Sequence, residues 1–75
     1  MAKLPVVSGS DDIKAFERGG WHVDRQHGSH VIMIKPGNIA SLSIPLHRVL
    51  APGTLRKLIR ATGISVDEFI KLLKV

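Results

Sequence analysis

The sequence predicts a small α+β domain in which helices cover one face of a three-stranded antiparallel sheet, in the order α-β-β-β-α-α. Three observations predict this fold. A short amphipathic stretch with cap residues comes first, three runs suited to strands follow it between glycine-containing turns, and two helical patterns end the chain. Its 75 residues, 44% apolar and 23% charged, suffice for one thin core, so we expect a single domain over residues 1–75.

The first helix is predicted over residues 9–18. N-cap candidates lie in the stretch from Ser8 to Asp11, and Ile13 and Phe16 give a short apolar stripe. The pair Gly19-Gly20 can end the helix in the left-handed conformation.

Three strands are predicted next. Residues 21–26 alternate Trp21, Val23 and Arg25 with His22, Asp24 and Gln26, the pattern of a strand with one wet face. A hairpin connection over 27–29 leads to a second strand over 31–34. A turn over 36–38 leads to a third strand over 39–44, which Pro45 closes.

The second strand is apolar on both alternations, with Val31 and Met33 on one side and Ile32 and Ile34 on the other. An antiparallel sheet covered on one face normally shows polar residues on its outer face. Either the twist of the sheet or a partner covers the second face. We take cover within the chain as the default.

Two helices complete the fold. Pro52 suits the first turn of one helix, and Gly63 suits the position just past its end. Ser65 and Glu68 have the spacing of a capping box, with Ile64 and Phe69 placed as a hydrophobic staple. Apolar residues then follow helical spacing from Val66 to Leu73.

Composition excludes several classes of protein. With no cysteine, the chain has no disulfides, no thiolate nucleophile and no Cys-based metal site. No apolar run approaches the roughly 18 residues of a membrane span, and the first residues lack the apolar stretch of a signal peptide. We therefore expect a soluble cytoplasmic protein that does not contact membranes.

The net charge of +5 comes entirely from residues 27–63, which hold five cations and no acidic residue. Such a block indicates a site for a polyanion, either nucleic acid or an acidic protein, and a solvated basic face is the alternative. Arg56 and Arg60 lie one helical turn apart and suit bidentate phosphate binding. The cations are Lys35, Arg48, Arg56, Lys57 and Arg60.

The triplet Gly28-Ser29-His30 places a histidine at the entrance of a strand, directly after a flexible turn. An imidazole can take or give a proton at physiological pH and could act on the 2′-hydroxyl of RNA. A structural or surface histidine is the alternative. His27, His30 and His47 could also approach one another, but no carboxylate or cysteine supports them, so we expect no metal site and no cofactor.

The chain resembles the HicA (YcfA-like) toxin family. The resemblance rests on Gly20-Trp21, on residues 25–30 (Arg-Gln-His-Gly-Ser-His), on residues 44–47 (Ile-Pro-Leu-His) and on residues 52–56 (Pro-Gly-Thr-Leu-Arg). It implies a double-stranded-RNA-binding-domain-like fold and an mRNA interferase of a type II toxin–antitoxin system, with His30 as the catalytic histidine. It also implies a HicB-like antitoxin that masks this histidine. The toxin would be monomeric alone and hetero-oligomeric with the antitoxin.

These observations lead to the hypothesis of a metal-independent RNA endonuclease that inhibits translation. His30 is the general base or acid, Gly28 and Ser29 help to place it, and the basic block binds phosphates. His47, Lys35 and Arg56 are the candidates for the complementary proton donor or for stabilising charge. The alternatives are a non-catalytic nucleic-acid-binding module and a domain whose basic surface binds an acidic partner protein.

Overall fold

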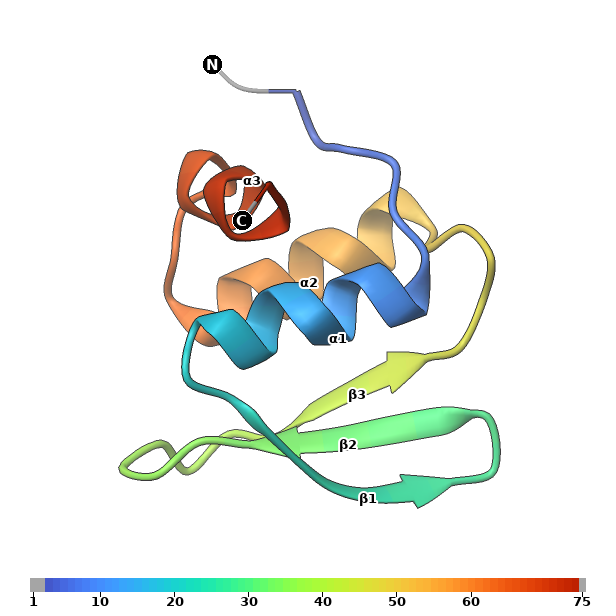
Figure 1. The fold of residues 1–75 in the computed structure, drawn as a ribbon, viewed down its shortest axis with the longest axis vertical. Coiled ribbons are helices and arrows are strands. Elements are labelled where there is room, and N and C mark those ends of the chain that lie inside the picture. Colours follow the sequence, from blue (N-terminus) through green and yellow to red (C-terminus); the bar gives the residue numbers. More distant parts are fainter. Residues whose placement is uncertain (1–2, 75) are drawn as a thin grey trace.

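The computed structural model describes residues 3–74, and in them three helices and three strands follow one another in the predicted order α-β-β-β-α-α (Figure 1). The elements are α1 (Gly9–Arg18), β1 (His22–His27), β2 (His30–Ile34), β3 (Leu42–Pro45), α2 (Pro52–Thr62) and α3 (Val66–Leu73).

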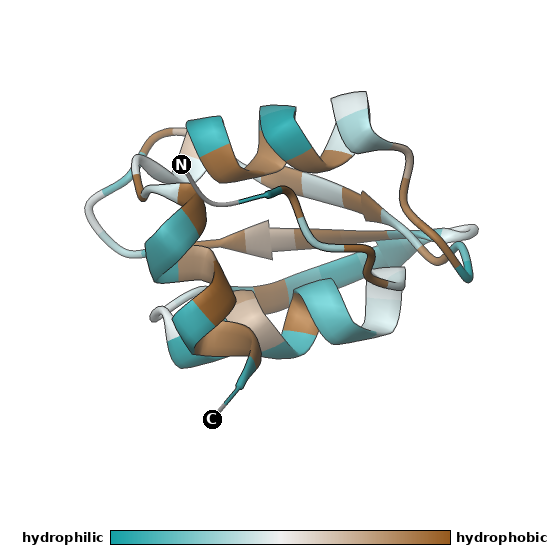
Figure 2. Ribbon diagram, turned by 90° about the horizontal axis from the view of Figure 1, so that it is seen from above, coloured by the Kyte–Doolittle hydropathy of each residue, from teal (hydrophilic) through white to brown (hydrophobic). Residues whose placement is uncertain are grey.

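The helices all lie on one face of the sheet (Figures 1 and 2). The strand order is β1-β2-β3 with both pairs antiparallel. Both α1 and α2 contact β3, and α3 packs against α1. Among residues 3–74, no helix has the length and the apolar composition needed to cross a membrane.

Local capping signals fix the helix ends as the sequence predicts. The Ser8 hydroxyl accepts a hydrogen bond from the Asp11 amide at 3.0 Å and begins α1. The Ser65 hydroxyl accepts from the Glu68 amide at 3.1 Å, and the Glu68 carboxylate accepts from the Ser65 amide, so α3 begins with a complete capping box. Gly63 ends α2 with a left-handed φ of 77°.

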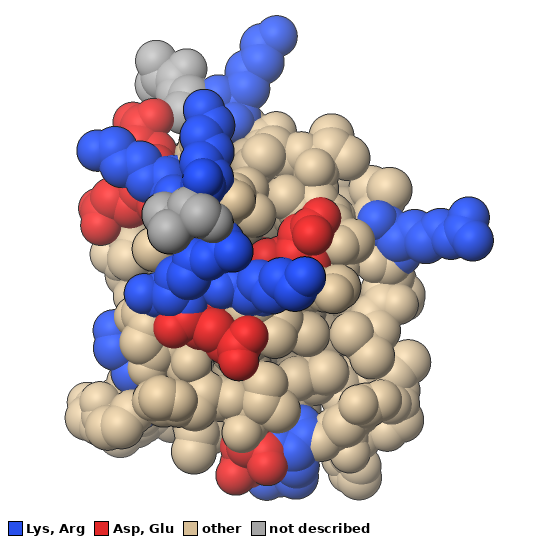
Figure 3. Space-filling view, in the orientation of Figure 1, with Lys and Arg blue, Asp and Glu red and all other residues tan. Residues whose placement is uncertain are grey.

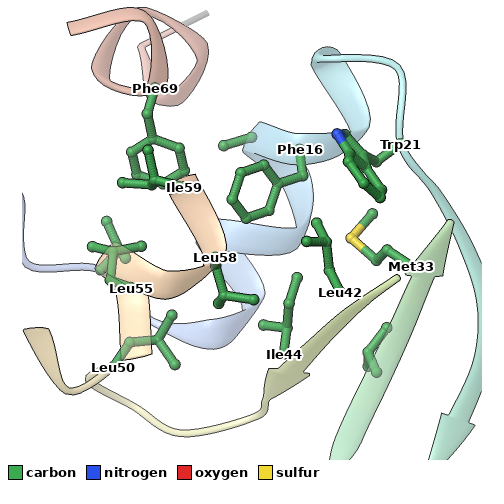
Figure 4. Close-up of a cluster of buried hydrophobic side chains, with 13 residues drawn as sticks. Phe16, Trp21, Met33, Leu42, Ile44, Leu50, Leu55, Leu58, Ile59 and Phe69 are labelled. Carbon is green, nitrogen blue, oxygen red and sulfur yellow. The ribbon is translucent and has the colours of Figure 1, made fainter. Parts of the chain in front are cut away.

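A single apolar core fills the space between the helices and the sheet (Figure 4). The rings of Phe16 and Phe69 join α1 to α3, with their centroids 5.3 Å apart and their planes tilted by 47°. The buried apolar residues are Val7, Ala15, Phe16, Trp21, Val31, Met33, Leu42, Ile44, Leu50, Leu55, Leu58, Ile59 and Phe69.

The predicted alternation in the first strand is wrong beyond Val23. A β-bulge lies between Val23 and Arg25, so that Val23 pairs with Met33 while Arg25 pairs with Ile32. The extra residue moves Arg25 onto the same face as His22 and His27. All six residues of β1 are exposed, because β1 forms an edge of the sheet.

The third strand is shorter than the predicted span of 39–44, because residues 39–41 lie outside it and Ile39 is fully exposed. Met33 pairs with Leu42, so continuing the same register would place Ile39 opposite Pro36. Proline has no amide hydrogen to donate, and Pro36 and Gly37 form a turn. The pairing therefore starts only at Leu42.

The face of the sheet away from the helices stays open. Val31 and Met33 are buried under the helices, whereas Ile32 on the other side is half-buried and Ile34 is 43% exposed. Cover within the chain, the expected default, is therefore wrong for Ile34. This open face carries the second apolar row of β2.

Candidate functional site at the β1–β2 hairpin

A two-residue turn brings His27 and His30 directly opposite each other. Gly28 has a φ of +60°, which glycine adopts without strain at the first central position of a tight hairpin turn. His27 and His30 are register partners at the ends of β1 and β2. Directly opposed residues project from the same face, and since Val31 points into the core, both imidazoles belong to the open face.

Hydrogen bonds to two backbone carbonyls hold the hairpin turn in place. The carbonyl of Ser29 accepts from the amide of Leu46 at 2.8 Å, just beyond the pairing of His30 with Pro45. The side-chain amide of Gln26 donates to the Gly28 carbonyl at 3.0 Å. The side chain of His30 is exposed, whereas the turn backbone before it is held by hydrogen bonds from Gln26 of β1 and from Leu46, which follows β3.

His47 lies at the same end of the sheet, two residues beyond Pro45. Its carbonyl accepts from the Gly9 amide at 2.9 Å, which ties the segment after β3 to the start of α1. The exposed His47 side chain lines a shallow cavity of about 240 Å³. The other lining residues are Ser8, Ser10, Leu46 and Arg48.

Gly9 makes this connection possible because it is buried against the β3 backbone. A Cβ at Gly9 would overlap the carbonyl oxygen of Pro45 and would lie within 3.1 Å of the Leu46 Cα. No larger residue fits there unless the segment that carries His47 moves.

The cations of residues 27–63 do not gather around His30. Lys35 follows the far end of β2, about 16 Å along the strand from His30 at about 3.3 Å per residue, and its ammonium donates to the Gly19 carbonyl at 3.1 Å. Arg56, Lys57 and Arg60 are exposed on α2, in the helical layer. Of the five, Arg48 is the one that shares a cavity with His47.

Figure 3 shows the same dispersal on one face of the molecule. Most of the Lys and Arg side chains visible there gather over the helices, with Asp and Glu side chains among them, and a separate group of acidic and basic side chains lies at the lower edge, where Figure 1 places β1. Positive charge is therefore spread over several surfaces, and the acid-free block in the sequence does not become one continuous field.

Two further classes of site can be assessed among residues 3–74. No group of three His, Cys, Asp or Glu side chains is arranged to hold a metal ion. Trp21 and Phe16 are 2% and 1% exposed, so neither can stack on a nucleic acid base.

Asp12 is a buried acid that the sequence reasoning did not single out. Its side chain is fully buried in α1, and neither carboxylate oxygen has a hydrogen-bond partner. Burial without compensation raises the pKa of Asp12 from 3.8 to about 7. The spacing to Ala15 and Phe16, three and four residues later, already places Asp12 on the apolar face of the helix.

The arrangement can move protons. Two imidazoles face each other at an exposed end of the sheet, and a third lies on the adjoining segment. Sequence reasoning considered His27 only as a metal ligand and missed its position opposite His30. The signal was present, because a two-residue loop makes its flanking residues cross-strand partners.

A known protein family matches most of the chain. A family model described as the HicA toxin of bacterial toxin–antitoxin systems matches residues 9–64, which is more than half of the chain and includes α1, the sheet and α2. No curated protein matches the sequence significantly.

Proposed function

The chain belongs to the HicA toxin family, and we propose that it is an endoribonuclease that cleaves mRNA and thereby stops translation. Membership makes it a toxin of a bacterial toxin–antitoxin system, and toxins of this family are generally ribonucleases. The observation that carries the proposal is the pair of exposed imidazoles, His27 and His30, on one face of the hairpin end.

His30 is the general base in this proposal. It takes the proton from a 2′-hydroxyl, and the 2′-oxygen attacks the adjacent phosphorus. The bond from phosphorus to the 5′-oxygen breaks, and that oxygen takes a proton from a second group. The products are a 2′,3′-cyclic phosphate and a free 5′-hydroxyl. Every proton moves between the RNA and side chains, so the reaction requires no metal ion.

The second group is His27. It is the direct register partner of His30, and the Cβ atoms of such a pair lie about 5 Å apart, so both side chains can reach one phosphodiester. His47 lies on the neighbouring segment and is the next candidate. Lys35 and Arg56 are less suitable, because Lys35 is bonded at the other end of β2 and Arg56 lines a groove in the helical layer.

Phosphates along the RNA bind first at Arg48, which adjoins His47. The exposed cations of α2, Arg56, Lys57 and Arg60, supply weaker contacts with flanking nucleotides through counterion release. Gly28 and Ser29 position His30 through the turn backbone, which the Leu46 amide holds at 2.8 Å.

A HicB-like antitoxin is the proposed inhibitor, covering His30. The open face of the sheet offers apolar contact area beside it, because Ile32 is half-buried and Ile34 is 43% exposed. An inhibitor seated on this face would bury both isoleucines and exclude RNA from the two imidazoles.

The decisive experiment compares an RNA with the same strand carrying a single 2′-deoxynucleotide at the cleaved position. We expect cleavage of the RNA, a 2′,3′-cyclic phosphate terminus in the product, and loss of cleavage at the substituted position. Equal binding of both strands without cleavage of either would instead identify a non-catalytic nucleic-acid-binding module.

A further inference from the structure

A groove on the helical side of the molecule is separate from the histidine end. It lies between the N-terminal segment before α1 and the connection from β3 into α2, and its volume is about 610 Å³. The amide of Leu50 donates to the carbonyl of Val7 at 2.8 Å and holds these two walls together. The lining residues are Lys3, Leu4, Pro5, Val6, Val49, Leu50, Pro52 and Arg56.

The groove exposes apolar surface that the fold does not use. Val6 is 82% exposed and Val49 is 59% exposed, one on each wall. Leu50 is buried and Leu4 packs partly against the core, so these two residues form a fixed floor of the groove. The side chains of Val6 and Val49 above it are exposed. Large aliphatic side chains at such exposure on both sides of one groove indicate contact with a partner.

The charge around the groove has one sign. Lys3 and Arg56 are its charged lining residues and both are exposed, and among residues 3–74 no acidic residue lines it. A ligand that fits must therefore place apolar groups between the valines and negative groups beside the ammonium and the guanidinium.

We propose that this groove docks a peptide segment of a partner protein in which aliphatic side chains are flanked by Asp or Glu. A nucleic acid fits less well, because phosphates gain nothing from two exposed valines and no aromatic side chain lines the groove for a base to stack on. The proposal is independent of the acid–base chemistry, since neither His27 nor His30 lines the groove, and it shares only Arg56 with the proposed RNA contacts.

The docked segment would also reach the histidine end indirectly. The connection from β3 to α2 presents His47 and Arg48 to the cavity near α1, and it presents Val49 and Leu50 to the groove. A ligand that contacts Val49 therefore touches the same short segment that carries His47.

Selection from a phage library of random short peptides, panned against the full chain, tests the proposal. The selected peptides should carry Asp or Glu beside Leu, Ile or Val. In fluorescence anisotropy their Kd should rise at least about tenfold with Val49→Ser and with Arg56→Glu. Lys57→Glu is the matched control: it makes the same charge change on the next residue of α2, which does not line the groove, and should leave the Kd unchanged.

Four results would overturn the proposal. The first is that Val49→Ser weakens the binding of none of the selected peptides. The second is that the selected peptides carry no carboxylates. The third is weaker RNA binding on Val49→Ser, which would make the groove an RNA surface. The fourth is a dimer in sedimentation that Val49→Ser dissociates, which would make it a self-interface. Val6→Ser, on the opposite and more exposed wall, repeats each measurement should Val49→Ser fold poorly.

Discussion

His27 and His30 face each other across the β1–β2 hairpin as direct register partners, on the face of the sheet that no helix covers. The geometry needs only a two-residue turn with a left-handed glycine, and it places two imidazole side chains at one end of the sheet. Acid–base cleavage of RNA needs one group to accept a proton and another to supply one. In the proposed reaction, His30 and His27 of the hairpin have these two roles.

Replacing His30 with alanine should lower the rate of RNA cleavage by about 10² to 10⁴, the typical contribution of a general base. His30 is exposed, so the melting temperature should stay close to that of the wild type. His22→Ala is the matched control, because His22 is an exposed histidine of the same sheet face, paired with Ile34 at the other end of β2. Equal loss of cleavage in both variants would rule out a specific role for His30.

Replacing His27 with alanine should slow cleavage by about 10², because the leaving oxygen would lose its proton donor. In an RNA with sulfur in place of the 5′-oxygen, the leaving group can depart without receiving a proton. This substrate should restore most of the cleavage rate of His27→Ala and little of the cleavage rate of His30→Ala. If the sulfur-substituted RNA restores the cleavage rate of His47→Ala but not that of His27→Ala, His47 is the proton donor.

A chelator should not change the rate of RNA cleavage, because the proposed mechanism needs only the 2′-hydroxyl and imidazoles. The measurement is the initial rate with and without EDTA, at a matched ionic strength, since phosphate contacts depend strongly on salt. Loss of cleavage in EDTA that added Mg²⁺ or Mn²⁺ restores would refute this mechanism.

Replacing Gly9 with alanine should destabilise the fold by about 1 to 3 kcal/mol, since a methyl group there overlaps the Pro45 carbonyl. In a domain of this size, each kcal/mol lowers the melting temperature by about 4 to 8 °C. Gly53→Ala is the control, because a Cβ at Gly53 meets nothing within 4 Å and helical backbone accepts alanine. It should leave stability unchanged or raise it by up to about 1 kcal/mol. An unchanged melting temperature for Gly9→Ala would contradict the close approach.

The stability of the wild type should fall as pH rises from about 4 to about 7. The pKa of Asp12 lies near 3.8 in the unfolded chain and near 7 in the fold, so the folded state holds this proton more tightly. Three pH units at about 1.4 kcal/mol each set an upper bound of about 4 kcal/mol for the loss. The loss is complete above pH 7 and absent below pH 3.8.

Urea unfolding at a series of pH values measures this effect in three proteins. Both Asp12→Val and Asp12→Asn remove the ionisation, so each should show a weaker loss of stability over this range than the wild type. Asp12→Val should be the more stable of the two, because the asparagine amide would be buried without partners. Wild-type pH dependence in the asparagine variant would show that Asp12 is not the responsible group.

The parts of the fold that the sequence predicts well depend on local signals. The N-cap at Ser8, the capping box of Ser65 with Glu68 and the left-handed Gly63 each involve residues within four positions of one another. They set the helix ends through contacts that do not depend on the tertiary arrangement. The hairpin around Gly28 is local in the same sense.

The parts that the sequence does not predict depend on partners distant in the chain. The bulge beside Val23 exists only in the pairing with β2, and β3 starts at Leu42 because of what lies opposite it. His30 begins β2 and Lys35 follows its far end, so two residues that are close in the sequence are separated by the length of the strand. Charge counted along the sequence therefore says little about charge density at a site.

The bulge in β1 has a consequence for self-association. A fully exposed edge strand is a ready template for pairing with another copy, and such pairing leads to aggregation. The bulge interrupts the regular spacing of free backbone groups at Asp24, and the ion pair of Asp24 with Arg25, 2.8 Å long, adds charge at that point. We therefore expect the bulge to disfavour pairing of β1 with a second copy of the chain, while the histidine end of the hairpin stays exposed.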